Sequence, residues 1–225
     1  MKSRAERAAE AEEAAFEAID ILWALALNDA PQRRGYIAYL SGADDKVVLR
    51  TLARLANASS LASTDGLEFA LADDDLAEEL RPKVPAAKRA EMHRKSLEYA
   101  AARAETSPAF VLHHTLGAGD FTAAATLAVA LLEKTETASR APLLAKAKQC
   151  LTGLWAVDGA DQALVERLGT AILRHGEPTF RPREFKEWVE RLRALPLADE
   201  SRAVVDAAVQ ARAQRKEEAK AEAQH

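Results

Sequence analysis

The sequence is short of the residues on which many classes of protein depend. Among its 225 residues Cys150 is the one cysteine, so no disulfide can form within the chain, which suits a reducing compartment. Glycine occurs nine times, proline eight times, and aromatic residues make up 5%. With its many alanines, this composition favours helices packed closely through small side chains.

Long hydrophobic runs are also lacking. The best apolar run, from Thr122 to Leu132, is too short to cross a bilayer. The first residues, Met-Lys-Ser-Arg-Ala-Glu-Arg, contain no hydrophobic region of a signal peptide. We therefore expect a cytoplasmic protein that does not bind membranes.

Neither sign of charge dominates the chain. Lys and Arg number 31 and Asp and Glu 35, which gives a formal net charge of -4, and the two signs are interspersed. This balance argues against a positive electrostatic potential over the whole molecule that would attract nucleic acid. A local basic face is compatible with it. Hydrophobic residues make up 48%, which indicates a globular protein.

Patterns typical of catalysis are absent from the sequence. No Ser/His/Asp, Cys/His or paired-carboxylate arrangement can be identified, and no Gly-x-x-x-x-Gly-Lys-Ser/Thr loop occurs. We therefore predict that the protein is not an enzyme and has no catalytic, cofactor-binding or metal-binding residues.

The spacing of apolar residues predicts a mainly α fold in four parts. Residues 1–15 are a charged helical arm, and residues 16–81 form a winged-helix-like domain of three short helices and a β-hairpin. In that hairpin Asp65-Gly66 is the turn, and Leu67, Phe69 and Leu71 alternate on one buried face. Residues 82–176 form stacked antiparallel helical hairpins, and residues 183–225 are amphipathic helices with a charged tail.

Capping signals support the helices of the second half. Ser107-Pro108 predicts the start of one helix, and Asp120, after Gly117-Ala118-Gly119, predicts the start of the next. Helices are also expected over 139–157, 161–175 and 183–195, with a linker over 176–182. Antiparallel pairs of tetratricopeptide size fit these lengths.

Three stretches in the middle of the chain follow one another in a particular order. A hairpin strand leads to a short helix, an Arg-x-x-x-His-Arg helix follows, and a His-His pair precedes Ala-Gly-Asp-Phe. In this order they resemble the region after the nucleotide-binding module of STAND-type regulators, of the MalT/LuxR-like and AfsR-like classes, over residues 16–135. The matching residues are Leu67, Phe69 and Leu76; Arg89, His93 and Arg94; and His113, His114, Ala118, Gly119, Asp120 and Phe121.

The resemblance implies a winged helix that leads into a tetratricopeptide-like array in a bacterial regulatory protein. Two departures limit what it implies. The His-Pro of the family is Ala72-Asp73 here, and the phosphate-binding loop of the family is absent. The family's ATP switch is therefore not expected in this chain.

A basic stripe on the helix expected over residues 44–58 is the candidate DNA contact. Lys46, Arg50 and Arg54 lie one turn apart, opposite the apolar face, where they would meet phosphates or guanines in the major groove. The simpler interpretation is a solvated face, because Asp44 and Asp45 at the start of the same helix would repel phosphate.

An apolar stripe in the C-terminal part is the candidate partner contact. Phe185, Trp188, Val189 and Leu192 recur at helical spacing after a proline-containing linker. Such a stripe either packs into the chain's own core or docks on another protein.

Histidines, aspartates and the cysteine have structural explanations as well as functional ones. His113 and His114 should point about a hundred degrees apart on a helix, so we do not expect them to share a metal ion. The run Asp73-Asp74-Asp75 is better explained as a helix cap than as a cation site. Cys150 is expected to be a packed thiol and not a nucleophile.

The sequence therefore favours a non-catalytic protein-interaction or scaffold module within a larger assembly. The alternative is a winged-helix transcription regulator that binds duplex DNA through the helix at 44–58. A protein partner is expected, while its identity and the oligomeric state are left open.

Overall fold

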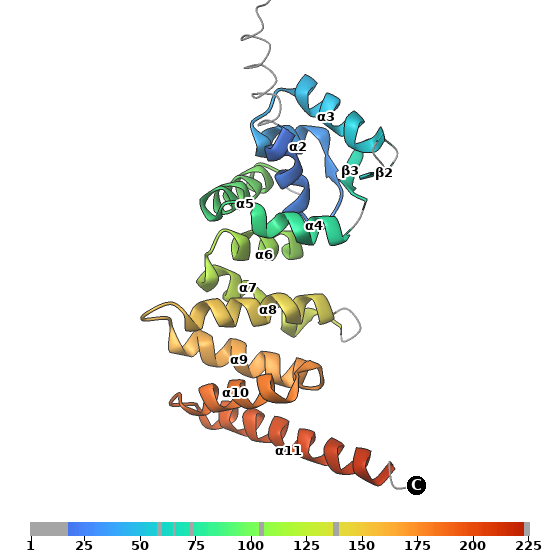
Figure 1. Cartoon of the computed structure of the whole chain (residues 1–225). Helices are drawn as coiled ribbons and strands as arrows, with labels where there is room; N and C mark the ends of the chain where they lie inside the picture. The colour runs from blue at the N-terminus through green and yellow to red at the C-terminus, as the bar shows by residue number, and fades with distance from the viewer. Residues whose placement is uncertain are drawn as a thin grey trace, which may run out of the picture. The chain divides into compact units, whose positions relative to one another are not determined.

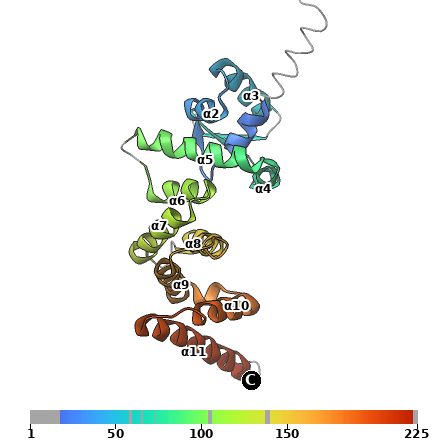
Figure 2. The ribbon, with the colours of Figure 1, turned by 90° about the vertical axis from the view of Figure 1, so that its left-hand side faces the viewer.

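The computed structural model describes residues 18–57, 60–64, 66–72, 74–103, 106–136 and 140–222. The chain divides into two compact units, Met1–Thr106 and Ser107–His225, and helices make up most of each (Figure 1; Figure 2). The helical arm predicted over residues 1–15 lies outside the described residues. Within the described part of the chain, no helix is long and apolar enough to cross a membrane.

The first unit places a small antiparallel sheet among short helices, as expected. The strands lie in the order β1-β3-β2, with β3 antiparallel to both neighbours. A helix over residues 18–26 comes first. The elements that follow are β1 (Gln32–Arg33), α2 (Arg34–Ser41), α3 (Asp45–Asn57), β2 (Leu61–Thr64) and β3 (Glu68–Leu71).

The sheet differs from the prediction in two details. Strand β1 is additional to the three short helices and the hairpin predicted for this domain, since Gln32 and Arg33 pair with β3. Gly66 adopts the positive φ that hairpin turns need, at 68°. Leu67 belongs to this turn and is 70% exposed, so the prediction that it shares a buried face with Leu71 was wrong.

Helix α5 (Ala86–Ala101) belongs to the first unit, together with α4 (Asp74–Leu80) and the 3-10 helix η1 (Arg81–Lys83). It packs against α2, where the Tyr36 hydroxyl donates to Ser96 Oγ at 2.7 Å. The rings of Tyr36 and Tyr99 lie 4.7 Å apart. These contacts place the boundary between the units near residue 106, whereas the sequence placed it at 81/82.

The second unit is a stack of helices. Helix α7 packs against α8 and α9, and α9 packs against α11, while α6 packs against α7 and α8. Figure 1 and Figure 2 show the helices following one another along the stack in chain order. Its elements are α6 (Pro108–Gly117), α7 (Phe121–Lys134), α8 (Arg140–Trp155), α9 (Gln162–Gly176), the 3-10 helix η3 (Glu177–Thr179), α10 (Pro182–Arg193) and α11 (Asp199–Glu222).

Local signals start the first two helices of the stack as predicted. Ser107 Oγ accepts a hydrogen bond from the Phe110 amide at 3.1 Å. Asp120 Oδ1 accepts from the Ala123 amide at 3.0 Å, directly after Gly119 with its φ of 85°. Each cap satisfies an amide that has no partner within its own helix.

One continuous apolar core runs from Leu112 in α6 to Ala208 in α11. Glycines allow the helices to approach closely: a Cβ at Gly169 would lie 2.5 Å from Leu192. The segment 176–182, expected to be a linker, contains η3 and the buried ring of Phe180. The stack therefore continues without interruption into α10 and α11.

Candidate functional site

The basic stripe of α3 is exposed, as the DNA-binding hypothesis requires. Val48, Thr51 and Leu52 form the buried face of the helix, and this arrangement leaves Lys46, Arg50 and Arg54 exposed. The helix starts at an Asp44 turn, where Asp44 Oδ1 accepts from the Lys46 amide at 2.8 Å.

The segment that follows α3 in the chain is acidic. From residue 58 to residue 80 the sequence contains no Lys or Arg, while it has seven acidic residues: Asp65, Glu68, Asp73, Asp74, Asp75, Glu78 and Glu79. At the start of α3, Arg34 pairs with Asp45 at 2.9 Å, and the basic Arg33 pairs with Glu68 of β3 at 3.4 Å. Phosphate contacts supply most of the affinity for DNA, and this hairpin offers no cation for them.

The apolar stripe predicted as a partner contact is part of the chain's own core. Phe185, Trp188, Val189 and Leu192 are all buried, with Trp188 only 7% exposed. The Trp188 ring meets the rings of Trp155 and Phe180 edge to face, with centroids 4.9 and 5.1 Å apart. These side chains hold α10 on the stack and are not available to a partner, so this prediction is corrected.

Cations cover this aromatic cluster, a feature the sequence analysis missed. Lys148 Nζ lies 3.6 Å from the centre of the Phe180 ring and pairs with Glu184 at 3.2 Å. Arg212 of α11 lies over the Phe185 ring at 4.6 Å, and its guanidinium donates to the Phe180 carbonyl at 3.0 Å. Contacts of this kind contribute about 0.5–2 kcal/mol each. They fix the middle of α11 against η3 and α10.

The histidines of α6 lie close together. The rings of His113 and His114 meet edge to face with centroids 4.8 Å apart, so the expectation that these side chains diverge was wrong. His114 is buried, and its ring lies 4.2 Å from that of Phe110. His113 Nδ1 lies 2.8 Å from Lys146 Nζ, which brings a cation to this ring. The hypothesis that these rings are packed histidines and not ligands stays a prediction.

Cys150 is the packed thiol that the sequence predicted. Its side chain is fully buried, and burial raises the pKa of the thiol to about 12. Because the thiolate is the nucleophile, this thiol is inert at neutral pH.

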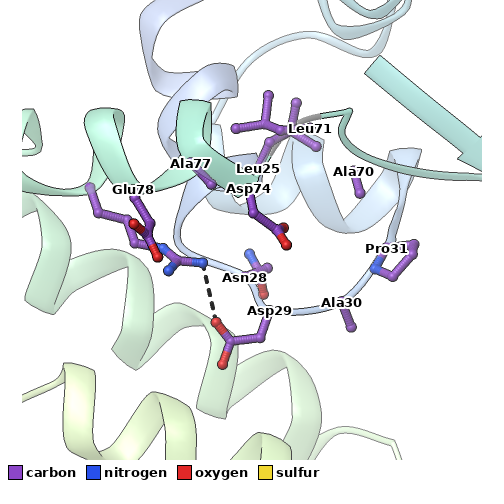
Figure 3. Close-up of a pocket in the computed structure, with 11 residues that line it drawn as sticks. Leu25, Asn28, Asp29, Ala30, Pro31, Ala70, Leu71, Asp74, Ala77 and Glu78 are labelled. Carbon is purple, nitrogen blue, oxygen red and sulfur yellow. Dashed lines mark hydrogen bonds and ion pairs between the residues drawn. The ribbon is translucent and has the colours of Figure 1, made fainter. Parts of the chain in front are cut away.

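A cavity of the first unit brings together residues that sequence spacing does not connect. It lies between the end of the helix at 18–26, strand β3 and α4, and its volume is about 410 Å³. In Figure 3 the carboxylates of Asp29, Asp74 and Glu78 surround it. A dashed line marks the ion pair of Asp29 with Arg81, at 3.3 Å.

Apolar residues complete the cavity. Leu25, Leu71 and Ala77 are buried at its wall, and Ala30, Pro31 and Ala70 line the rest. In the sequence only the acidic run at 73–75 pointed to this place, and it was explained as a cap. Asp74 and Asp75 do lie in the first turn of α4, while Asp73 lies outside the described residues.

Comparison with known proteins does not assign this chain to a family. No family model, no curated protein and no solved structure matches it.

Proposed function

We propose that this chain is a non-catalytic protein-interaction or scaffold module that works as a subunit of a larger assembly. The end of α11 carries the proposal. The last buried residue of α11 is Ala208, yet the helix continues to Glu222, and every side chain from Ala213 to Glu222 is exposed. Figure 1 shows this part, the α11 extension (residues 213–222), running past the end of α10.

The α11 extension has the chemistry of a contact surface. Most helical stability in proteins comes from packing against other elements, and these residues are helical although their side chains are exposed. Charges of both signs are interspersed along the helix, and exposed charges of both signs can select a partner through charge pairs. They are Arg215, Lys216, Glu217, Glu218, Lys220 and Glu222.

The stack beneath the extension supports the same function. Each helix from α6 to α11 packs mainly against near neighbours in the chain. Stacks of this kind present long surfaces to other proteins, because their cores grow in one direction only. Burial is the main cause that raises the pKa values of the Tyr36 hydroxyl and the Cys150 thiol, which is typical of structural groups.

Removing the end of the α11 extension should separate binding from folding. We expect the free energy of unfolding of a chain that ends at Lys216 to lie within about 0.5 kcal/mol of that of the full chain, because the side chains of residues 217–222 that it loses are exposed. Tagged full-length and shortened chains would be cross-linked in the native host, purified and analysed by mass spectrometry. The full chain should retain a protein partner near stoichiometry, and the shortened chain should lose it.

A matched variant controls for a general change of surface charge. Glu187→Gln combined with Glu190→Gln neutralises two exposed carboxylates of α10 and raises the net charge by two, as the truncation does, and it should leave the partner bound. Equal retention by the shortened and full chains, or recovery of the full chain without any protein partner, would contradict the proposal.

A winged-helix regulator that binds duplex DNA is the second candidate, favoured by the exposed stripe of α3. Our proposal predicts that the full chain binds a mixed duplex pool no tighter than about 10⁻⁵ M at physiological salt. Arg50→Glu combined with Arg54→Glu should leave this weak binding and the fold unchanged. Fluorescence anisotropy measures the affinity. Tight, salt-dependent binding that the double variant abolishes would establish the second candidate instead.

A further inference from the structure

The cavity of the first unit is built to accept a long, partly apolar side chain. Its volume of about 410 Å³ lies within the usual range for ligand pockets. Leu25, Leu71 and Ala77 supply apolar wall, against which methylene groups can pack. The stems of lysine and arginine bury in this way while their charged ends remain with polar groups.

The charge around the cavity is negative and not internally balanced. Three carboxylates, of Asp29, Asp74 and Glu78, face one guanidinium, of Arg81, which leaves a formal charge of about -2 at neutral pH. Asp29 is paired with Arg81. Among the described residues, Asp74 and Glu78 have no cationic partner within 4.0 Å.

Arg81 uses two of its donors to hold the wall of the cavity. Its Nε donates to the Ala26 carbonyl at 2.7 Å, at the end of the first helix, and its Nη2 donates to Asp29 at 3.3 Å. Its partners among the described residues are the Ala26 carbonyl and Asp29, whereas Asp74 and Glu78 lie one turn apart on α4 and share a face.

The free carboxylates select the occupant. A guanidinium is planar and carries five donors, so it can bridge two carboxylates, whereas a lysine ammonium is a compact point charge. The net negative charge of the lining would repel a phosphate-bearing ligand.

We propose that this cavity receives an arginine side chain from a basic segment of a protein partner. The guanidinium lies between Asp74 and Glu78, and its stem packs on Leu71 and Ala77. This site rests on the proposed function, which supplies the partner. It deepens that function by specifying the chemical group that the partner presents.

A short peptide tests the cavity without knowledge of the partner. The full ¹⁵N-labelled chain would be titrated with the blocked tripeptide Gly-Arg-Gly and, separately, with Gly-citrulline-Gly, in which the neutral isostere of arginine replaces it. We expect the arginine peptide to shift the amide signals of Ala30, Ala70 and Ala77 with a millimolar dissociation constant. The citrulline peptide should leave them in place.

Two variants assign the effect to the cavity. Asp74→Asn combined with Glu78→Gln should weaken binding of the arginine peptide about tenfold or more. Unchanged amide signals in the rest of the chain would show that the variant is folded. Glu218→Gln with Glu222→Gln makes the same change of charge on α11 and should have no effect.

Several outcomes would overturn the arginine site. They are no shift with the arginine peptide, equal shifts with citrulline, or unchanged affinity in the Asp74/Glu78 variant. None of them bears on whether the α11 extension holds a partner, because the peptide measures the cavity alone.

Discussion

Replacing Trp188 with alanine is expected to lower the free energy of unfolding of the second unit by about 3–5 kcal/mol. The indole is 7% exposed, and it packs against Trp155, Phe180 and the helices on either side. Its removal leaves a cavity and takes one aromatic contact away from each of Trp155 and Phe180. Urea unfolding followed by far-ultraviolet circular dichroism measures the loss without relying on tryptophan fluorescence.

A surface variant on the same helix provides the control. Lys186 of α10 is exposed and makes a long ion pair with Glu190, at 3.8 Å, so Lys186→Ala should change stability by about 0.5 kcal/mol or less. If Trp188→Ala left the stability unchanged and removed a partner, the stripe of α10 would be a docking face after all. Because α10 and α11 supply part of the core, the second unit of a chain that ends at Thr179 should not fold.

Replacing Gly153 with alanine is the second change with a large expected effect. A Cβ at this position would overlap the ring of Phe121 at the start of α7. The ring would have to move, and overpacking of this kind costs about 1–3 kcal/mol. Because alanine is the better helix former by about 1 kcal/mol, any net loss of stability is attributable to the clash.

Gly35 is the matched position, since it is also a glycine within a helix, α2. A Cβ there meets no atom within 4 Å, so Gly35→Ala should stabilise the first unit by up to about 1 kcal/mol. Thermal unfolding of the two variants beside the parent chain measures both effects. Stabilisation by both alanines would show that α7 and α8 do not approach as closely as the structure has them.

The sequence predicted the elements that are determined by local chemistry. The hairpin followed from Asp65-Gly66, and the starts of α6 and α7 followed from Ser107 and Asp120, because turn and cap preferences act over a few residues. The prediction that the apolar residues of α10 lie on one face of the helix was also confirmed.

What covers each face could not be predicted. Periodicity shows that Trp188 lies on an apolar face, but not whether Trp155 or another protein covers it. Helix α5 joined the first unit through tyrosine contacts on α2, which leave no periodic signal. The cavity depends on Asp29 and Arg81, which are 52 positions apart, so no local pattern could reveal it.

Hydrogen–deuterium exchange of α11 tests the central claim most directly. In the isolated chain, amides of the α11 extension should exchange fast, because the exposed end of a helix opens locally, while those around Val205 and Ala208 should be protected. In the assembly purified from the native host, the extension should become protected to a similar degree. Exchange of the extension that is equally fast in both samples would contradict the account, since no partner would then cover it.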